Sequence, residues 1–97
     1  MVNGDIITVM ALSGEYVGRL VGRGEDGSIT IESPRMIVAS EQGMGFSNGI
    51  AATGVKDPKE VKFQSYIFTT ETNDEVQSAW RQAVTGLVTA PKQGVII

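Results

Sequence analysis

The sequence predicts a small, mainly β domain that ends in an amphipathic helix. Short runs rich in β-branched and aromatic residues recur between glycine-rich turns, and one helical stripe of apolar residues follows them. The chain has 97 residues, of which 41% are hydrophobic and 20% charged. This length suits a single domain over residues 1–97, and the composition is typical of a folded chain rather than a disordered one.

The first third of the chain predicts three strands joined by tight turns. A β-branched run from Ile6 to Leu12 ends at a Ser-Gly pair that suits a turn, and a second strand follows over 16–23. Glycines inside this second strand predict a bend, a bulge or a close backbone approach. Asp26-Gly27 is a dipeptide that type I′ hairpin turns prefer, and the strict alternation after it predicts a strand over residues 28–33.

The segment after Pro34 divides less simply into strands. Because proline cannot donate to a ladder, the run 36–39 either continues the third strand beyond a bulge or lies on a sheet edge. The glycine-rich segment 41–54 predicts a bent or irregular fourth strand, and the aromatic-rich run 61–70 predicts a fifth. We therefore expect a bent five-stranded antiparallel sheet or small barrel over about residues 6–70.

A helix is predicted over about residues 74–85. Thr72 and Glu75 have the spacing of a capping box, and the apolar stripe after them must pack against another element. Trp80 lies on this stripe and is interpreted as an anchor of the core or of an interface. The tail 87–97 ends in apolar residues, for which three fates remain open: packing on the same domain, pairing with a neighbouring chain, or fraying.

Composition excludes several kinds of chemistry. The chain has no cysteine and no histidine, which removes disulfides, thiolate nucleophiles, Ser-His-Asp triads and His-based zinc sites. The two pairs of adjacent carboxylates fall at a turn and at a helix start, and each of these positions already accounts for acidic residues. The glycine motif that begins at Gly22 has the spacing of a dinucleotide-binding motif, but it precedes a strand rather than the helix that dinucleotide binding needs. We therefore expect a non-enzymatic protein with no catalytic residue, metal or cofactor.

The net charge is slightly negative. Eleven acidic and eight basic residues give a formal charge of −3, so nucleic acid or anionic lipid would need a local basic patch. The first residues lack the cationic and apolar regions of a signal peptide, and no apolar run approaches about 18 residues. We therefore expect a cytoplasmic protein that has no membrane contact.

The first three strands also carry a longer motif. It consists of a strand, a Ser-Gly turn, a Gly-x-Leu-x-Gly strand, a tight turn and an Ile-x-Ile-Glu strand. Its residues are Val9, Leu12, Gly14, Gly18, Leu20, Gly22, Glu25, Ile29, Ile31 and Glu32. The motif resembles the first conserved block of the Sm-like family (LSm/Hfq-type), the small bent-barrel proteins related to eukaryotic Sm proteins and bacterial Hfq.

The resemblance implies a homo-oligomeric ring of roughly five to seven subunits, in which an open strand of one subunit pairs with an open strand of the next. In the family an Asp and an Asn after the second strand contact RNA bases, whereas this chain has Gly24 and Ser28 there. The second family block has no counterpart between Phe46 and Phe68, and the usual N-terminal helix is missing. Divergent phage-encoded members look like this, and a phage origin would place the protein in the host cell cytoplasm.

Two sets of residues are candidates for contacts. Basic and polar side chains would meet phosphate groups, and a ring would repeat them around its axis. They are Arg19, Arg23, Ser28, Arg35, Lys56, Lys59 and Lys62. The interleaved acids Asp57 and Glu60 fit a solvated face equally well. Apolar and aromatic side chains are expected at the contact between subunits, namely Met44, Phe46, Ile50, Phe63, Tyr66 and Phe68.

Two functions follow from the resemblance. The preferred hypothesis is a ring that binds RNA with low sequence specificity. The alternative is a structural or assembly protein, for example of a phage particle, whose ring binds protein. The missing Asp and Asn and the negative net charge favour this alternative. Salt-sensitive binding of an unstructured RNA distinguishes the two, because phosphate contacts release counterions.

Overall fold

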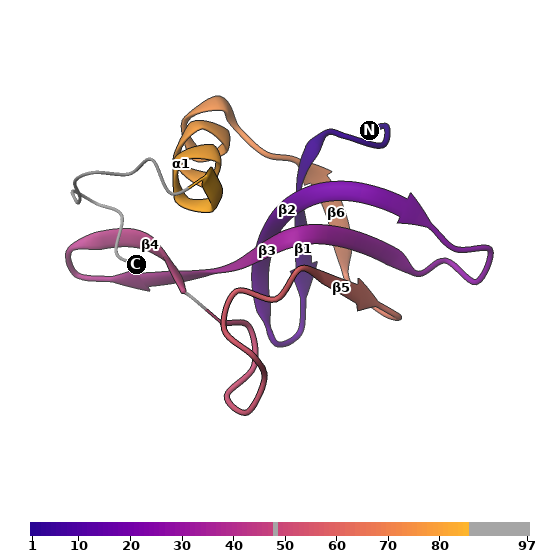
Figure 1. Ribbon diagram of the computed structural model, residues 1–97, viewed down its shortest axis with the longest axis horizontal. Helices are drawn as coiled ribbons and strands as arrows, with labels where there is room; N and C mark the ends of the chain where they lie inside the picture. The colour runs from indigo at the N-terminus through magenta and orange to yellow at the C-terminus, as the bar shows by residue number, and fades with distance from the viewer. Residues whose placement is uncertain (48, 86–97) are drawn as a thin grey trace.

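The computed structural model describes residues 1–47 and 49–85 and arranges them as an antiparallel sheet with one helix (Figure 1). The elements in chain order are β1 (Ile6–Ala11), β2 (Gly14–Arg23), β3 (Ile29–Ser40), β4 (Gly43–Ser47), β5 (Glu60–Phe63), β6 (Phe68–Glu71) and α1 (Asp74–Thr85). The prediction of a mainly β fold with a C-terminal amphipathic helix is confirmed, and the helix has the predicted bounds. The tail 87–97 lies outside the described residues.

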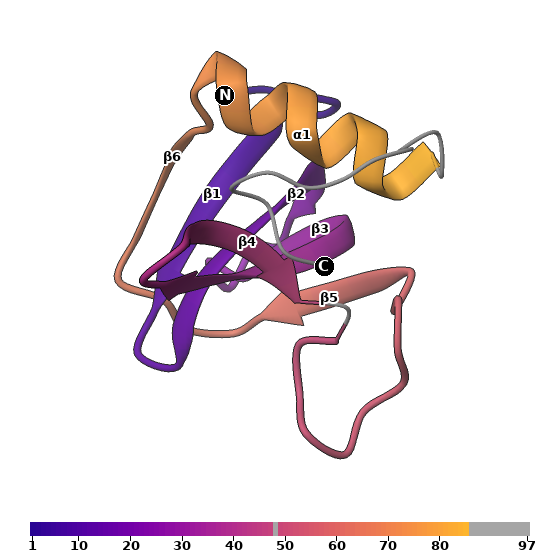
Figure 2. The same cartoon turned by 90° about the vertical axis from the view of Figure 1, so that its left-hand side faces the viewer.

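The sheet is organised around the long strand β3. Its first half pairs with β2 on one side and with β5 on the other, and its second half pairs with β4. The strand order is β4-β3-β2-β1-β6, with β5 beside β3. Only residues 64–67 separate β5 from β6, yet these strands lie at different edges of the sheet (Figure 2). The sheet is therefore rolled, although no ladder joins β5 to β6 in the described part of the chain.

The second half of the sheet differs from the sequence prediction, which had five strands. Of the two possibilities left open for the run 36–39, the structure shows continuation of the third strand, since β3 passes through Pro34 with Ser33 at a positive φ of 51°. Within the predicted fourth strand over 41–54, only residues Gly43–Ser47 form a strand, which is β4. The predicted fifth strand over 61–70 is two strands, β5 and β6. Between them the Ile67 N–H donates to the Met10 carbonyl at 2.7 Å, which directs the chain toward β1.

The irregularity that the glycines predicted in the second strand is present as register shifts and a close backbone approach. The register between β2 and β3 shifts twice, between Val17 and Arg19 and again between Leu20 and Gly22. A Cβ atom on Gly18 would lie 2.9 Å from the Glu32 carbonyl oxygen, so only glycine permits this approach of the two backbones. The glycine that interrupts the strand pattern thus marks a close approach of β2 and β3.

Each face of the sheet has its own apolar cluster. Alternation along the strands separates the two clusters, since neighbours such as Ile6 and Ile7 point to opposite faces. The first cluster lies inside the rolled sheet and contains Ile7, Val9, Tyr16, Leu20, Ile29 and Ile31. The second contains Ile6, Val17, Phe46 and Trp80, and it joins the helix to the outer face. Trp80, 1% exposed, is the core anchor that its position on the stripe predicted.

The start of α1 uses a different cap from the one predicted. The Asn73 side-chain oxygen accepts a 2.9 Å hydrogen bond from the Val76 N–H, so Asn73 is the N-cap. The prediction of a capping box formed by Thr72 and Glu75 is wrong. The Thr72 hydroxyl is buried and is hydrogen-bonded to the Thr8 hydroxyl at 2.8 Å, which ties the helix entry to β1.

Candidate functional site

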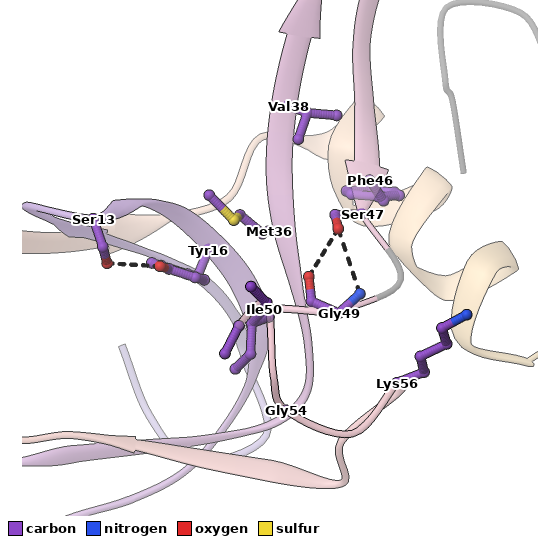
Figure 3. A pocket seen from close by; sticks show the side chains of 12 residues that line it. Ser13, Tyr16, Met36, Val38, Phe46, Ser47, Gly49, Ile50, Gly54 and Lys56 are labelled. Atoms are coloured by element: carbon purple, nitrogen blue, oxygen red, sulfur yellow. Dashed lines mark hydrogen bonds between the residues drawn. The ribbon is translucent and has the colours of Figure 1, made fainter.

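An open groove with a volume of about 730 Å³ lies beside the β3–β4 hairpin (Figure 3). The hairpin forms one wall, and residues 49–56 form the other. The side chains that line the walls are mainly apolar and include Met36, Val38, Phe46 and Ile50. Lys56 is the one charged residue among the described residues that line the groove, so the groove offers a mainly apolar surface, a composition that suits an apolar occupant rather than a nucleic acid.

The groove continues the core inside the rolled sheet. Tyr16 belongs to that core, Met36 and Ile50 pack against it, and all three line the groove. Met36 is paired with Tyr16 on one side and with Ser47 on the other, so the groove floor is a row across three strands. The Tyr16 hydroxyl is hydrogen-bonded to the Ser13 hydroxyl at 2.7 Å (Figure 3). The groove is thus the open end of the core.

An ion pair between a buried arginine and an exposed aspartate fixes the chain beside the groove. An Arg35 guanidinium nitrogen lies 2.7 Å from an Asp57 carboxylate oxygen, with the Arg35 side chain 8% exposed and the Asp57 side chain 64% exposed. A buried guanidinium needs an opposite charge to offset its lost hydration. This pair therefore connects β3 to the segment that walls the groove. The Arg35 Nε atom is buried and has no hydrogen-bond partner among the described residues.

The basic and polar candidates do not form one surface. Arg35 and Ser28 are buried, at 7% and 2% exposure. Arg19 lies 3.4 Å from a Glu32 carboxylate oxygen, and its guanidinium carbon lies 5.3 Å from the centre of the Trp80 ring. Glu32 is also paired across the sheet with Glu60, so carboxylates lie between Arg19 and Lys62 of the next strand.

The remaining basic candidates are exposed. Arg23 ends β2, Lys56 lines the groove, Lys59 directly precedes β5, and Lys62 is paired with Thr30. Lys59 also accepts a 2.7 Å backbone hydrogen bond from Ser33 through its carbonyl. These four residues come from two strands and a loop.

The hairpin between β2 and β3 is held by an acidic side chain. Asp26 accepts a 3.0 Å hydrogen bond from the Ser28 N–H. Hydrogen bonding from the Ser28 side chain, then from its backbone, lowers the pKa of Asp26 below 3.8, and the charge of Lys62 adds to this effect. A Cβ atom on Gly24 would collide with the Ser28 hydroxyl. Gly24 and Ser28 thus both contribute to the turn itself.

The six apolar interface candidates fall into three pairs. Phe46 and Ile50 line the groove. Phe63 and Tyr66 pack against the inner core, with the Phe63 ring centre 5.0 Å from that of Tyr16. Met44 on β4 and Phe68 on β6 are 49% and 51% exposed. Only this last pair lies on strands that form the two ends of the strand order.

Besides Met44 and Phe68, the structure exposes apolar side chains in a region that the sequence did not predict. Ala11 pairs with Gly14, so Leu12 and Ser13 form the turn between β1 and β2, and Leu12 is 96% exposed. Ile67, at 59% exposure, lies with Leu12 on a smaller cavity of about 420 Å³. The pattern could not reveal this region, because Leu12 continues an apolar run that predicts a strand interior.

The described residues contain neither a candidate metal site nor a helix that could cross a membrane. Within residues 1–47 and 49–85, no group of three His, Cys, Asp or Glu side chains is placed to hold a metal ion. Over the same residues, no helix combines the length and apolar character needed to cross a bilayer. Comparison of the chain with protein-family models, curated proteins and solved structures gives no significant match.

Proposed function

We propose that this protein is a non-enzymatic, Sm-like assembly protein whose copies join head to tail into a ring through the free edges of β4 and β6. The observation that carries the proposal is the strand order within residues 1–47 and 49–85, in which β4 and β6 are the two ends of one sheet. An unpaired edge presents a row of backbone donors and acceptors to any suitable strand. Joining one edge to the other creates a heterologous contact, which closes into a ring when the rotation permits.

The composition of the two edges supports pairing. β4 reads Gly-Met-Gly-Phe-Ser and β6 reads Phe-Thr-Thr-Glu, so neither contains the lysine or proline that commonly protects a free edge. Each edge also carries an exposed apolar side chain, Met44 on β4 and Phe68 on β6. Contact between these edges would bury both side chains and satisfy the backbone groups together.

The topology supports the Sm-like part of the proposal. β4 and β5 pair in series with the same side of β3, so they correspond to one fourth strand interrupted by residues 48–59. With β6 beside β1, the sheet then has the five strands expected of a small bent barrel. The extra segment carries the groove wall, and α1 takes the place of an N-terminal helix as the only helix among the described residues.

The charge distribution favours a protein partner over RNA for such a ring. Two of the seven phosphate-contact candidates are buried, and acids interleave with the others. The exposed side chains Lys56, Lys59 and Lys62 keep RNA binding as a second candidate function, since a ring would repeat them around its axis. The assembly of the ring through β4 and β6 does not depend on whether the ring binds protein or RNA.

The ring is tested by the solution mass of the purified protein and of two edge variants. Light scattering on the unmodified protein at micromolar concentration should give a multiple of the 10.3 kDa chain mass. Met44→Asp and Phe68→Asp each place a charge on one edge, and each should yield monomers. Val2→Asp is the matched control, because Val2 is 67% exposed and lies outside every strand.

A mixture of the two variants separates head-to-tail assembly from other modes. Met44→Asp keeps an intact β6 edge, and Phe68→Asp keeps an intact β4 edge. Their mixture should therefore form a 1:1 dimer and stop there, because the outer edges of that dimer are both altered. A monomeric unmodified protein, or a mixture that stays monomeric, would overturn the ring.

A further inference from the structure

We propose that Leu12 and Ile67 of one subunit fill the groove beside the β3–β4 hairpin of the next subunit in the ring. This inference rests on the proposed function, since it takes the pairing of β4 with β6 as given. It adds the side chains that occupy the groove and the direction in which the two paired strands run.

The two strand edges are too short to form a stable contact by themselves. A stable protein interface buries about 800 Å² on each partner, from about 20–30 residues a side. β4 contributes five residues and β6 contributes four. The contact between subunits therefore has to extend into the surfaces that continue the two edges.

Each edge continues into an apolar surface. β4 ends at Ser47, which lines the groove. β6 begins directly after Ile67, which lies with Leu12 on the smaller cavity. The Ile67 N–H donates to the carbonyl of Met10, two residues before Leu12, so both exposed side chains belong to the region where β6 begins. The groove thus lies at the end of β4, and its proposed occupants lie at the start of β6.

Antiparallel pairing brings these two surfaces together. Every ladder among the described residues is antiparallel, and antiparallel pairs are slightly more stable per residue than parallel ones. In an antiparallel pair the start of one strand lies opposite the end of the other. The start of β6, with Leu12 and Ile67, therefore lies opposite the end of β4, with the groove.

Exposure and charge also fit this occupant. Leu12 is 96% exposed and Ile67 is 59% exposed, so both have apolar area to lose, and the groove of about 730 Å³ has room for two aliphatic side chains. The described residues that line the smaller cavity are uncharged, and Lys56 is the one charged residue described along the groove. The contact therefore opposes no like charges, although each copy has a net charge of −3.

A spin label tests the contact in a dimer of known direction. In the 1:1 mixture of Met44→Asp and Phe68→Asp, the first chain supplies the β6 edge and the second supplies the β4 edge. The chain has no cysteine, so Gln64→Cys at an exposed position near Ile67 gives the Met44→Asp chain a single nitroxide site. In the Phe68→Asp chain, with 13C-labelled methionine and isoleucine methyl groups, the signals of Met36 and Ile50 should lose intensity several-fold.

The reference signal is that of Ile29, which lies seven residues from Met36 along β3, or about 23 Å away. Reversed labelling is the control, with the nitroxide on the Phe68→Asp chain and 13C on the Met44→Asp chain. It should leave the Met36 and Ile50 signals intact, because the labelled start of β6 then faces no partner. Attenuation in this arrangement, equal attenuation of Met36 and Ile29, or no attenuation in the first arrangement would overturn the inference.

Substitutions show whether the aliphatic side chains cause the contact. Leu12→Ser together with Ile67→Ser in the Met44→Asp chain should raise the dissociation constant of the mixed dimer at least about tenfold. Val55→Ser in the Phe68→Asp chain is the matched control, because Val55 is 70% exposed and lies in the segment 49–56 but does not line the groove. It should leave the dissociation constant unchanged. Equal dissociation constants with and without the two serines would contradict the inference.

The ring and the groove contact fail in different ways. A mixture that stays monomeric removes the ring, and the groove contact with it. A mixed dimer of the expected mass in which Met36 and Ile50 keep their signal intensity preserves the ring and overturns only the groove contact.

Discussion

The indole nitrogen of Trp80 donates a 2.9 Å hydrogen bond to the carbonyl oxygen of Ser33, the residue at which β3 takes a positive φ of 51°. The N–H of Ser33 donates in turn to the Lys59 carbonyl at 2.7 Å. Both backbone groups of Ser33 are therefore bonded to other elements at the point where Pro34 contributes no donor. The helix and the start of β5 together hold β3 in a conformation that its own sequence disfavours.

The first prediction concerns this contact. Trp80→Phe removes the hydrogen bond, leaves the Ser33 carbonyl without its donor and opens a cavity, and we expect it to lower the free energy of unfolding by about 2–4 kcal/mol. Urea denaturation followed by circular dichroism measures the change. Gln82→Ala, on the exposed side of the same helix, should stay within about 0.5 kcal/mol of the unmodified protein. Similar losses in both variants would argue against a specific role of Trp80.

The helix cap gives a second prediction. Asn73→Ala should reduce the free energy of unfolding by about 1 kcal/mol, because the Val76 N–H loses its acceptor. Asn73→Asp should retain most of the stability, since a carboxylate accepts the same hydrogen bond and complements the helix dipole. Thermal unfolding of the two variants, with the exposed Ser78→Ala as control, provides the comparison. A loss as large for aspartate as for alanine would show that Asn73 is not the cap.

The ion pair beside the groove gives a third prediction. Asp57→Ala leaves the buried Arg35 guanidinium unpaired, and because Asp57 itself is largely exposed we expect a loss of about 1–3 kcal/mol rather than the full value for a buried pair. Amide exchange should quicken over residues 49–56, which lose their connection to β3. Glu41→Ala removes the same charge from an exposed turn and should change neither quantity. In the double variant Arg35→Met with Asp57→Ala, stability should partly recover.

Sequence reasoning was most successful where one local signal dominated. The strict alternation after Gly27 placed the start of β3, and the apolar stripe around Trp80 gave α1 its bounds. After Pro34 it left two possibilities open, and hydrogen bonds from distant elements to Ser33 accompany the one that the structure shows, in which β3 continues. It failed where a tertiary contact decided the outcome. Thr72 has the sequence position of a helix cap, but its hydroxyl is hydrogen-bonded to Thr8 instead.

The candidate site could be anticipated only in part. Phe46 and Ile50 were singled out as apolar residues in a segment too glycine-rich for a helix, and both line the groove. The groove itself depends on how β4 and residues 49–56 lie around β3, which no local pattern encodes. Arg35 was expected at the surface because arginine usually is. Its burial follows from Asp57, whose position depends on the fold of the intervening chain.

The lowered pKa of Asp26 leads to a prediction about pH. Because the pKa in the folded protein is below the unfolded value of 3.8, ionised Asp26 stabilises the hairpin at higher pH, and this contribution is lost as the pH falls through the folded pKa. Carboxyl chemical shifts recorded from pH 6 to about 2 should show a midpoint for Asp26 below that of an ordinary aspartate. Ser28→Ala should move this midpoint upwards. An unchanged midpoint would exclude Ser28 as the main cause.

The last prediction separates a protein-binding ring from an RNA-binding one. Since carboxylates interleave with the exposed lysines, we expect a labelled oligo-uridine strand to bind no more tightly than non-specific ligands do, with a dissociation constant of about 10⁻⁴–10⁻⁶ M at physiological salt. Fluorescence anisotropy across a salt series measures this. Binding near 10⁻⁸ M would establish RNA as the ligand instead. In that case the triple variant Lys56→Gln, Lys59→Gln, Lys62→Gln should weaken binding and flatten the salt dependence, while Arg81→Gln on the exposed helix surface should not, because only phosphate contacts release counterions.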